Sequence, residues 1–167
     1  LPPPEAIKVL RQAGLKKAFV SSSSDEGTQK LYDEAKDLIV PVLRPYRKRG
    51  ELSTWFRDET VVDMLSKRLD KNIYAGIGEF HIFGENADLP VMKQVVALAK
   101  KHQLFLHAHS DAEAVDRLFA QNPDARILWA HSGFDSPDVI EEMLGKHKNL
   151  WSDLAFRSEH AADGALE

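Results

Sequence analysis

The sequence predicts an α/β protein with a parallel sheet, and it favours part of an eight-stranded (β/α)8 TIM barrel. Short apolar runs alternate with segments of helical periodicity, as in proteins built from strand–helix–strand units. These runs are apolar on both faces, which is typical of strands covered on both sides. Histidine or acidic residues follow several successive runs, and polar groups spread over successive strand ends indicate a barrel.

An open doubly wound parallel sheet is the alternative, and it would be complete at 167 residues. Such a sheet binds ligands at one switch point and often has a glycine-rich phosphate loop after its first strand. Here the first predicted strand is followed by four serines, residues 21–24. We therefore predict a single domain over residues 1–167 that contains about strands two to seven of a barrel. We expect the natural chain to extend in both directions.

The first part of the chain is predicted to alternate helices and short strands. Pro4 suits a first helical turn and Gly14 a helix end, whereas Pro41 removes a hydrogen-bond donor from a strand. The predicted elements are a helix at 4–14, a strand at 18–20, a helix at 25–38, a strand at 39–43, a loop at 44–53 and a helix capped by Thr54 or Asp58 that ends at Leu69.

The second part continues the alternation with stronger helix signals. Met92, Val95 and Val96 lie on one helical face, and Asp111 is suited to cap the following helix, which ends at Asn122. The predicted elements are a strand within 74–81, a helix at 87–101, a strand at 104–109, a helix at 111–122, a strand at 127–131, a helix from 136 and a strand at 150–154. The tail from Ser158 onward has no strong pattern.

Composition and charge exclude several classes of function. The formal net charge is -4 and the pI is about 6.0, so the chain has no general attraction to nucleic acid or anionic lipid. The sequence has no cysteine, so a bound metal would be held by His, Asp or Glu. No apolar run approaches the roughly 20 residues that span a bilayer. We expect a small-molecule substrate, a homo-oligomer is compatible with the sequence, and the cytoplasm is the default location.

The segment 104–111, Leu-Phe-Leu-His-Ala-His-Ser-Asp, is the most informative motif. His107 and His109 are two positions apart, so a strand places them on the same face. The alternative is one buried core histidine and one solvated histidine. The pattern recurs, because one apolar run ends at His131 and another ends at Glu79 and His81. Three strand ends of this kind favour a metal site.

The segments Gly-Glu79, Leu-His107-Ala-His109 and Ala-His131-Ser-Gly resemble strands four, five and six of the amidohydrolase superfamily, in particular its amidohydrolase-related metal-dependent hydrolases. The strand–helix spacing agrees over most of the chain. The resemblance implies a barrel that binds one or two divalent ions, most often zinc. It implies metal ligation by Glu79, His107 and His131, with His109 competing for the strand-five position, and catalytic roles for His131 and Glu79. The family's His-x-His pair on strand one and aspartate on strand eight have no counterpart here.

Polar residues after other predicted strands are candidates for substrate binding. Arginine can hold a carboxylate or phosphate through two parallel hydrogen bonds, and a solvated loop side chain is the alternative in each case. The candidates are Arg44, Tyr46, His81, His109 and Arg157. Asp153 follows the last strand, where it could orient a ligand histidine or pair with an arginine. Trp55 and Phe56 are expected to pack under the long loop or to form a pocket wall.

The function expected from these features is metal-dependent hydrolysis of an amide, ester or lactone bond through an activated water. The alternatives are metal-dependent decarboxylation or hydration, and a barrel that has lost its metal and its activity. A substrate carboxylate bound by Arg44 or Arg157 beside the metal would distinguish a lyase from a hydrolase. These residues alone are too few to complete a zinc site, so we expect the isolated segment to be inactive.

Overall fold

Six parallel strands form one sheet in the order in which they occur along the chain. The computed structural model describes residues 1–157, 161–162 and 165–166. The strands are β1 (Ala18–Val20), β2 (Ile39–Leu43), β3 (Gly76–His81), β4 (Phe105–His109), β5 (Ile127–Trp129) and β6 (Leu150–Ser152). Each neighbouring pair is parallel. The predicted α/β class and strand order are confirmed.

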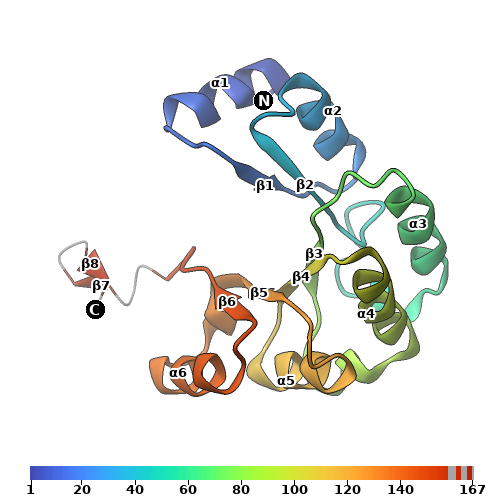
Figure 1. Cartoon of the computed structure of the whole chain (residues 1–167), viewed down its shortest axis with the longest axis vertical. Helices are drawn as coiled ribbons and strands as arrows, with labels where there is room; N and C mark the ends of the chain where they lie inside the picture. The colour runs from blue at the N-terminus through green and yellow to red at the C-terminus, as the bar shows by residue number, and fades with distance from the viewer. Residues whose placement is uncertain (158–160, 163–164, 167) are drawn as a thin grey trace.

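The sheet is curled, and the helices lie along its outer side (Figure 1). The helices are α1 (Pro3–Gln12), α2 (Glu26–Glu34), α3 (Thr60–Leu69), α4 (Pro90–His102), α5 (Ala112–Gln121) and α6 (Pro137–Lys146). Short 3-10 turns, η1 (Trp55–Arg57), η2 (Gly84–Asp88) and η3 (Ala130–Phe134), join some of them, and β7 (Ala161–Ala162) pairs antiparallel with β8 (Ala165–Leu166). No helix in the described part of the chain is long and apolar enough to cross a membrane.

Most helix starts follow the predicted capping chemistry, but α3 differs: Glu59 rather than Thr54 or Asp58 is its N-cap residue, and the Asp58 carboxylate accepts a hydrogen bond of 3.0 Å from the Thr60 N–H. A proline lies in the first turn of α1, α4 and α6, where its missing N–H costs nothing. The Asp111 carboxylate accepts a hydrogen bond of 2.9 Å from the Ala114 N–H and so caps α5, as the sequence predicts. These caps fix where each helix leaves the carboxyl end of the preceding strand.

Several elements end earlier than the sequence predicts, and for two of them the physical reason is clear. The helix expected to reach Leu38 ends at Glu34, because the chain turns to bury Leu38 against Ile7 and Ile39. The strand expected to reach His131 ends at Trp129, and His131 has a left-handed φ of 55°. Gly133 allows this turn, since a Cβ there would lie 2.5 Å from the Trp129 ring. Tertiary packing therefore sets both ends.

The main core lies between the outer face of the sheet and the helices. Trp55, Phe80 and Trp129 are its largest fully buried side chains. The Trp55 N–H donates to the His81 carbonyl at 3.0 Å, and the Trp129 N–H donates to the Ser110 carbonyl at 2.7 Å. Both indoles thus hold the carboxyl ends of strands in place, and Trp55 has the predicted packing role.

The inner face of the sheet carries the histidines of β4. Leu106 and Ala108 are 1% and 0% exposed under the helices, and Phe105, His107 and His109 point to the opposite side. On β3, a Cβ at Gly78 would lie 2.2 Å from the His107 carbonyl oxygen, so only glycine fits beside this strand. The register then shifts between Gly78 and Phe80, which leaves Glu79 as the extra residue of a β-bulge.

Candidate metal site

Six ionisable side chains meet at the carboxyl end of the sheet. They are Glu79 and His81 of β3, His107 and His109 of β4, His131 of η3 and Asp153 after β6. Parallel strands place their carboxyl ends at one edge, so residues far apart in sequence become neighbours. The sequence predicts this convergence for Glu79, His107 and His131, and the structure brings all three together with His81, His109 and Asp153.

Glu79 is at the centre of the cluster. Its Oε1 lies 3.1 Å from His109 Nδ1 and 3.6 Å from His131 Nε2. Its Oε2 accepts a hydrogen bond of 3.2 Å from Arg44 Nη2. Burial alone would raise the pKa of Glu79, but the bond to His109 and the nearby His107 and Arg44 outweigh it and lower this pKa. Glu79 is therefore a carboxylate at neutral pH.

His81 and His109 form a stacked pair, with ring centroids 4.1 Å apart. The Tyr46 hydroxyl accepts a hydrogen bond of 2.7 Å from the His81 backbone N–H and lies 2.9 Å from His81 Nδ1. Burial and the neighbouring His109 lower the pKa of His81 to about 4. His81 is thus a neutral imidazole at pH 7, which is the form that binds a metal ion.

Asp153 holds the histidine that follows β5. Its Oδ1 accepts a hydrogen bond of 3.1 Å from the His131 backbone N–H and lies 3.2 Å from His131 Nδ1. Its Oδ2 lies 3.9 Å from His107 Nε2. Burial lowers the pKa of His107 despite the nearby carboxylates, and its buried Nε2 has no hydrogen-bond partner in the described part of the chain.

These side chains fit a divalent metal ion. Ligand atoms of Glu79, His81 and His109 lie within 4.8 Å of one another. A carboxylate with two imidazoles is a donor set that suits zinc and similar ions, and the Nε2 of His107, which has no hydrogen-bond partner among the described residues, is a third nitrogen at the same end of the sheet. Ligation by Glu79, His107, His109 and His131 remains a prediction. The sequence predicts that His81 binds substrate. In the structure His81 lies with the candidate metal ligands Glu79 and His109, because it shares a strand face with Glu79.

The residues predicted to bind substrate occupy different surroundings. Arg44 and Tyr46 lie beside Glu79 and His81, and Arg44 Nε is buried without a hydrogen-bond partner among the described residues. Arg157 is 3% exposed and donates to the carbonyls of His131 at 3.1 Å and Asp135 at 2.8 Å. Arg157 thus supports the backbone of the His131 turn.

Exposed aromatic rings surround the histidines, which the sequence did not indicate. The ring of Phe134 lies 5.7 Å from His109 and 5.3 Å from His131, and Phe156 lies 5.2 Å from His131. Phe134 is 52% and Phe156 79% exposed. Both have a left-handed φ, so these positions depend on turns that carry no simple sequence signal. They give the polar cluster an apolar rim.

A comparison with solved structures finds a similar fold in the crystal structure of 4-oxalomesaconate hydratase from Rhodopseudomonas palustris. The TM-score is 0.63 at 12% sequence identity, and the match covers 90% of this chain. The chain spans 58% of the length of that hydratase. At this identity the likeness concerns the fold. No protein-family model matches the sequence, and no curated protein matches it.

Proposed function

We propose that this chain is part of a metal-dependent lyase of the amidohydrolase superfamily that hydrates or decarboxylates a small carboxylated substrate. The observation that carries the proposal is the position of Arg44, whose guanidinium lies 3.2 Å from Glu79 and keeps a buried Nε without a partner in the described residues. A guanidinium beside a metal site can bind a substrate carboxylate through two hydrogen bonds. The hydratase with the same fold is consistent with this chemistry.

The ligand set in this proposal consists of Glu79, His81 and His109, with His107 as a further ligand. When bound, a divalent ion supplies an activated water near neutral pH and polarises a carbonyl group. Asp153 Oδ1 accepts a hydrogen bond from the His131 backbone N–H and lies 3.2 Å from His131 Nδ1, and His131 Nε2 lies 3.6 Å from Glu79. His131 can therefore hold or transfer a proton at Nε2 on the side where the substrate binds.

Hydrolysis of an amide, ester or lactone bond is the second candidate. The position of His131 beside Asp153 favours it, because an imidazole next to a carboxylate can donate a proton to a leaving group. In this case Arg44 would serve mainly to keep Glu79 ionised. Both candidates use the same metal ligands, so they have to be distinguished by the substrates that the protein turns over.

The metal content of the full-length protein tests the site. We expect bound zinc or another divalent ion by elemental analysis, and a loss of at least about 10-fold in affinity for Glu79→Gln and His109→Ala. His102→Ala, at the end of α4, is the matched control and should retain its metal. A full-length protein that binds no divalent metal would refute both candidates.

Activity on two substrate panels decides between the candidates. The first panel consists of unsaturated carboxylic acids, whose turnover is measured as loss of ultraviolet absorbance and release of carbon dioxide. The second panel consists of esters, amides and lactones, whose hydrolysis is measured as release of acid. We expect turnover of carboxylic acids. Metal-dependent turnover of the second panel alone would replace the lyase with the hydrolase.

A further inference from the structure

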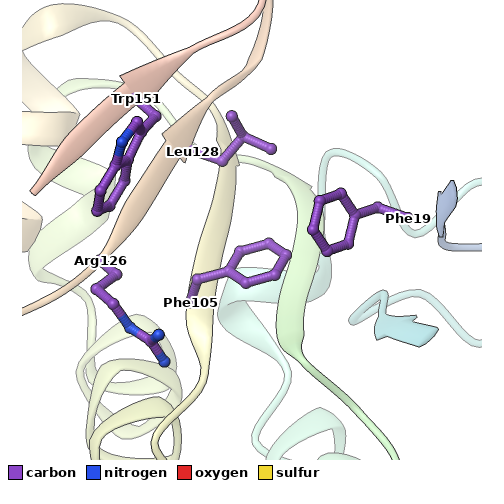
Figure 2. Close-up of a pocket in the computed structure, with 5 residues that line it drawn as sticks. All are labelled: Phe19, Phe105, Arg126, Leu128 and Trp151. Carbon is purple, nitrogen blue, oxygen red and sulfur yellow. The ribbon is translucent and has the colours of Figure 1, made fainter. Parts of the chain in front are cut away.

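The inner face of the sheet is divided into an apolar part and a polar part. Phe19, Phe105, Leu128 and Trp151 line an apolar hollow of about 220 Å³, with Arg126 at its border (Figure 2). No histidine or carboxylate is among the described residues that line this hollow. On this face the groups that can bind an ion therefore gather at the carboxyl end of the sheet, where the contacts that orient their rings determine how they bind it.

One buried hydroxyl contacts both the backbone and the ring of His81. Tyr46 lies in the loop after β2 and is 3% exposed. Its hydroxyl accepts a hydrogen bond of 2.7 Å from the His81 backbone N–H and lies 2.9 Å from His81 Nδ1. No other hydrogen bond of this hydroxyl is present in the described part of the chain. The two contacts with His81 therefore determine where the proton of the hydroxyl can go.

His81 is held from further sides as well. Trp55, whose ring contacts Tyr46 edge-on, donates its indole N–H to the His81 carbonyl at 3.0 Å. The ring of His81 stacks on His109 with an interplanar angle of 25°. The backbone on both sides of His81, one face of its ring and the Nδ1 edge are thus fixed by the protein itself. Because Nδ1 faces Tyr46, Nε2 is the ring nitrogen left to bind an ion.

The Tyr46 hydroxyl can serve His81 Nδ1 both as a donor and as an acceptor. The backbone N–H only donates, so the hydroxyl oxygen accepts there and its own proton is available to an unprotonated Nδ1. The proton of the neutral His81 ring is then on Nε2. Binding of an ion at Nε2 removes that proton, and Nδ1 takes one up, so the ring stays neutral. Tyr46 can then accept from the Nδ1–H, whereas an ionised carboxylate in its place could serve only this second state.

We propose that Tyr46 is a positioning residue for the metal site. Its hydroxyl holds Nδ1 of His81 as a donor before an ion binds and as an acceptor afterwards, and this directs the ion to Nε2. Ligand atoms of His81, Glu79 and His109 lie within 4.8 Å of one another, so a change in the tilt of the His81 ring would separate them. This role rests on the proposed function, in which His81 is a metal ligand.

Removal of the Tyr46 hydroxyl tests this role. Tyr46→Phe in the full-length protein keeps the ring and removes the oxygen. Tyr74→Phe is the matched control, because Tyr74 is 7% exposed, donates its hydroxyl to Asp25 at 2.6 Å and lies before β3, whereas His81 ends this strand. Zinc affinity is measured by competition with a chelator. We expect about 10- to 100-fold weaker binding in Tyr46→Phe, as is typical when the partner of a metal-binding histidine is lost, and unchanged binding in Tyr74→Phe.

Nitrogen NMR of the full-length protein with isotope-labelled histidine reports which ring nitrogen carries the proton. His81 is identified by the resonances that disappear in His81→Gln. We expect the proton on Nε2 in the metal-free protein and on Nδ1 in the zinc-loaded protein. In Tyr46→Phe the metal-free ring should be a mixture of both tautomers, whereas a lower stability of the fold alone would leave the tautomer unchanged.

Three results would overturn this role. Equal zinc affinity of Tyr46→Phe and the parent protein would show that the hydroxyl does not act on metal binding. An equal loss of affinity in Tyr74→Phe would show a general effect of reduced stability. A proton already on Nδ1 in the metal-free parent protein would show that Tyr46 is not the donor. A full-length protein that binds no metal would instead refute the proposed function together with this role, so the two failures are distinguishable.

Discussion

The proposed recognition of a carboxylated ligand rests on Arg44. It is the cation closest to Glu79, and its guanidinium also lies 5.7 Å from the centre of the Tyr46 ring. A lysine at this position would keep the charge but lose the planar pair of donors. Substrate binding should therefore be more sensitive to this substitution than protein stability.

Arg44→Lys is expected to raise KM for a carboxylated substrate by about 10- to 100-fold, because one charge-assisted hydrogen bond is lost. Steady-state kinetics of the acid and of its methyl ester measure this effect, with Arg11→Lys on α1 as the control. The ester should be affected much less than the acid. Equal losses for acid and ester would mean that Arg44 acts only on Glu79.

The strand β3 shows how the backbone of one element can position a candidate metal ligand. Gly78 has a φ of 142°, and a Cβ there would lie 2.2 Å from the His107 carbonyl oxygen. Glu79 follows at the bulge and turns toward His109. The close approach of β3 to β4 is thus a condition for the Glu79–His109 contact.

Gly78→Ala should lower the free energy of unfolding by roughly 2–4 kcal/mol, because alanine is strained at this φ and overlaps β4. Gly145→Ala on α6 is the matched control, since nothing lies within 4 Å of a Cβ there. Urea unfolding followed by circular dichroism measures both variants. A Gly78→Ala protein as stable as the control would contradict the close approach of these strands.

A polar contact joins α2 to α3. Arg68 of α3 pairs with Asp25 and Glu26 at the start of α2. Hydrogen bonds from Ser24 and Arg68 lower the pKa of Glu26 from 4.5 to about 2. A lowered pKa in the folded state gives stability that is fully present above pH 4.5 and is lost as the pH falls toward 2.

Glu26→Gln is therefore expected to be less stable than the parent protein at pH 7 and equally stable near pH 2. Glu26 is 53% exposed on its side chain, so solvent screening keeps the difference below about 1 kcal/mol. Urea unfolding at a series of pH values measures it. A difference that stays constant from pH 7 to pH 2 would show that the charge of Glu26 does not contribute.

The six α-helices and the six strands of the parallel sheet were largely predictable, because apolar patterns and helix-start residues such as Asp111 of α5 mark them. The short pair β7–β8 was not predicted, since the tail carries no strong pattern. The convergence of Glu79, His107 and His131 followed from parallel strands alone. The end of α2 and the left-handed turn at His131 were not predictable, since packing of Leu38 and Trp129 determines them. The rim of Phe134 and Phe156 depends on turns for the same reason.

At the scale of the whole molecule, the apolar interior consists of two clusters. A small one contains Ile7, Ala35, Leu38 and Ile39, and a larger one extends from Leu43 to Leu150. The small cluster joins α1 and α2 to β2, at one end of the arc in Figure 1. Loss of packing in the small cluster should expose α1, β1 and β2 to solvent before the rest of the protein unfolds.

Leu38→Ala is expected to cost about 2–5 kcal/mol, because Leu38 is 1% exposed and leaves a cavity. Hydrogen exchange measured by mass spectrometry should speed up in α1, β1 and β2, and remain slow in β4 and β5. Leu144→Ala, at a position 41% exposed on α6, is the control. Uniformly faster exchange would indicate one cooperative core.

The six strands lie in the sheet in the same order as in the chain, and this has a consequence for biosynthesis. As the polypeptide leaves the ribosome, each new strand finds its pairing neighbour already made, so the sheet can grow one strand at a time. Asp153, which follows β6, is the last of the six clustered side chains to be synthesised. The turn at His131 gains its carboxylate support only then, so the cluster of ionisable side chains is completed after the strands that carry it.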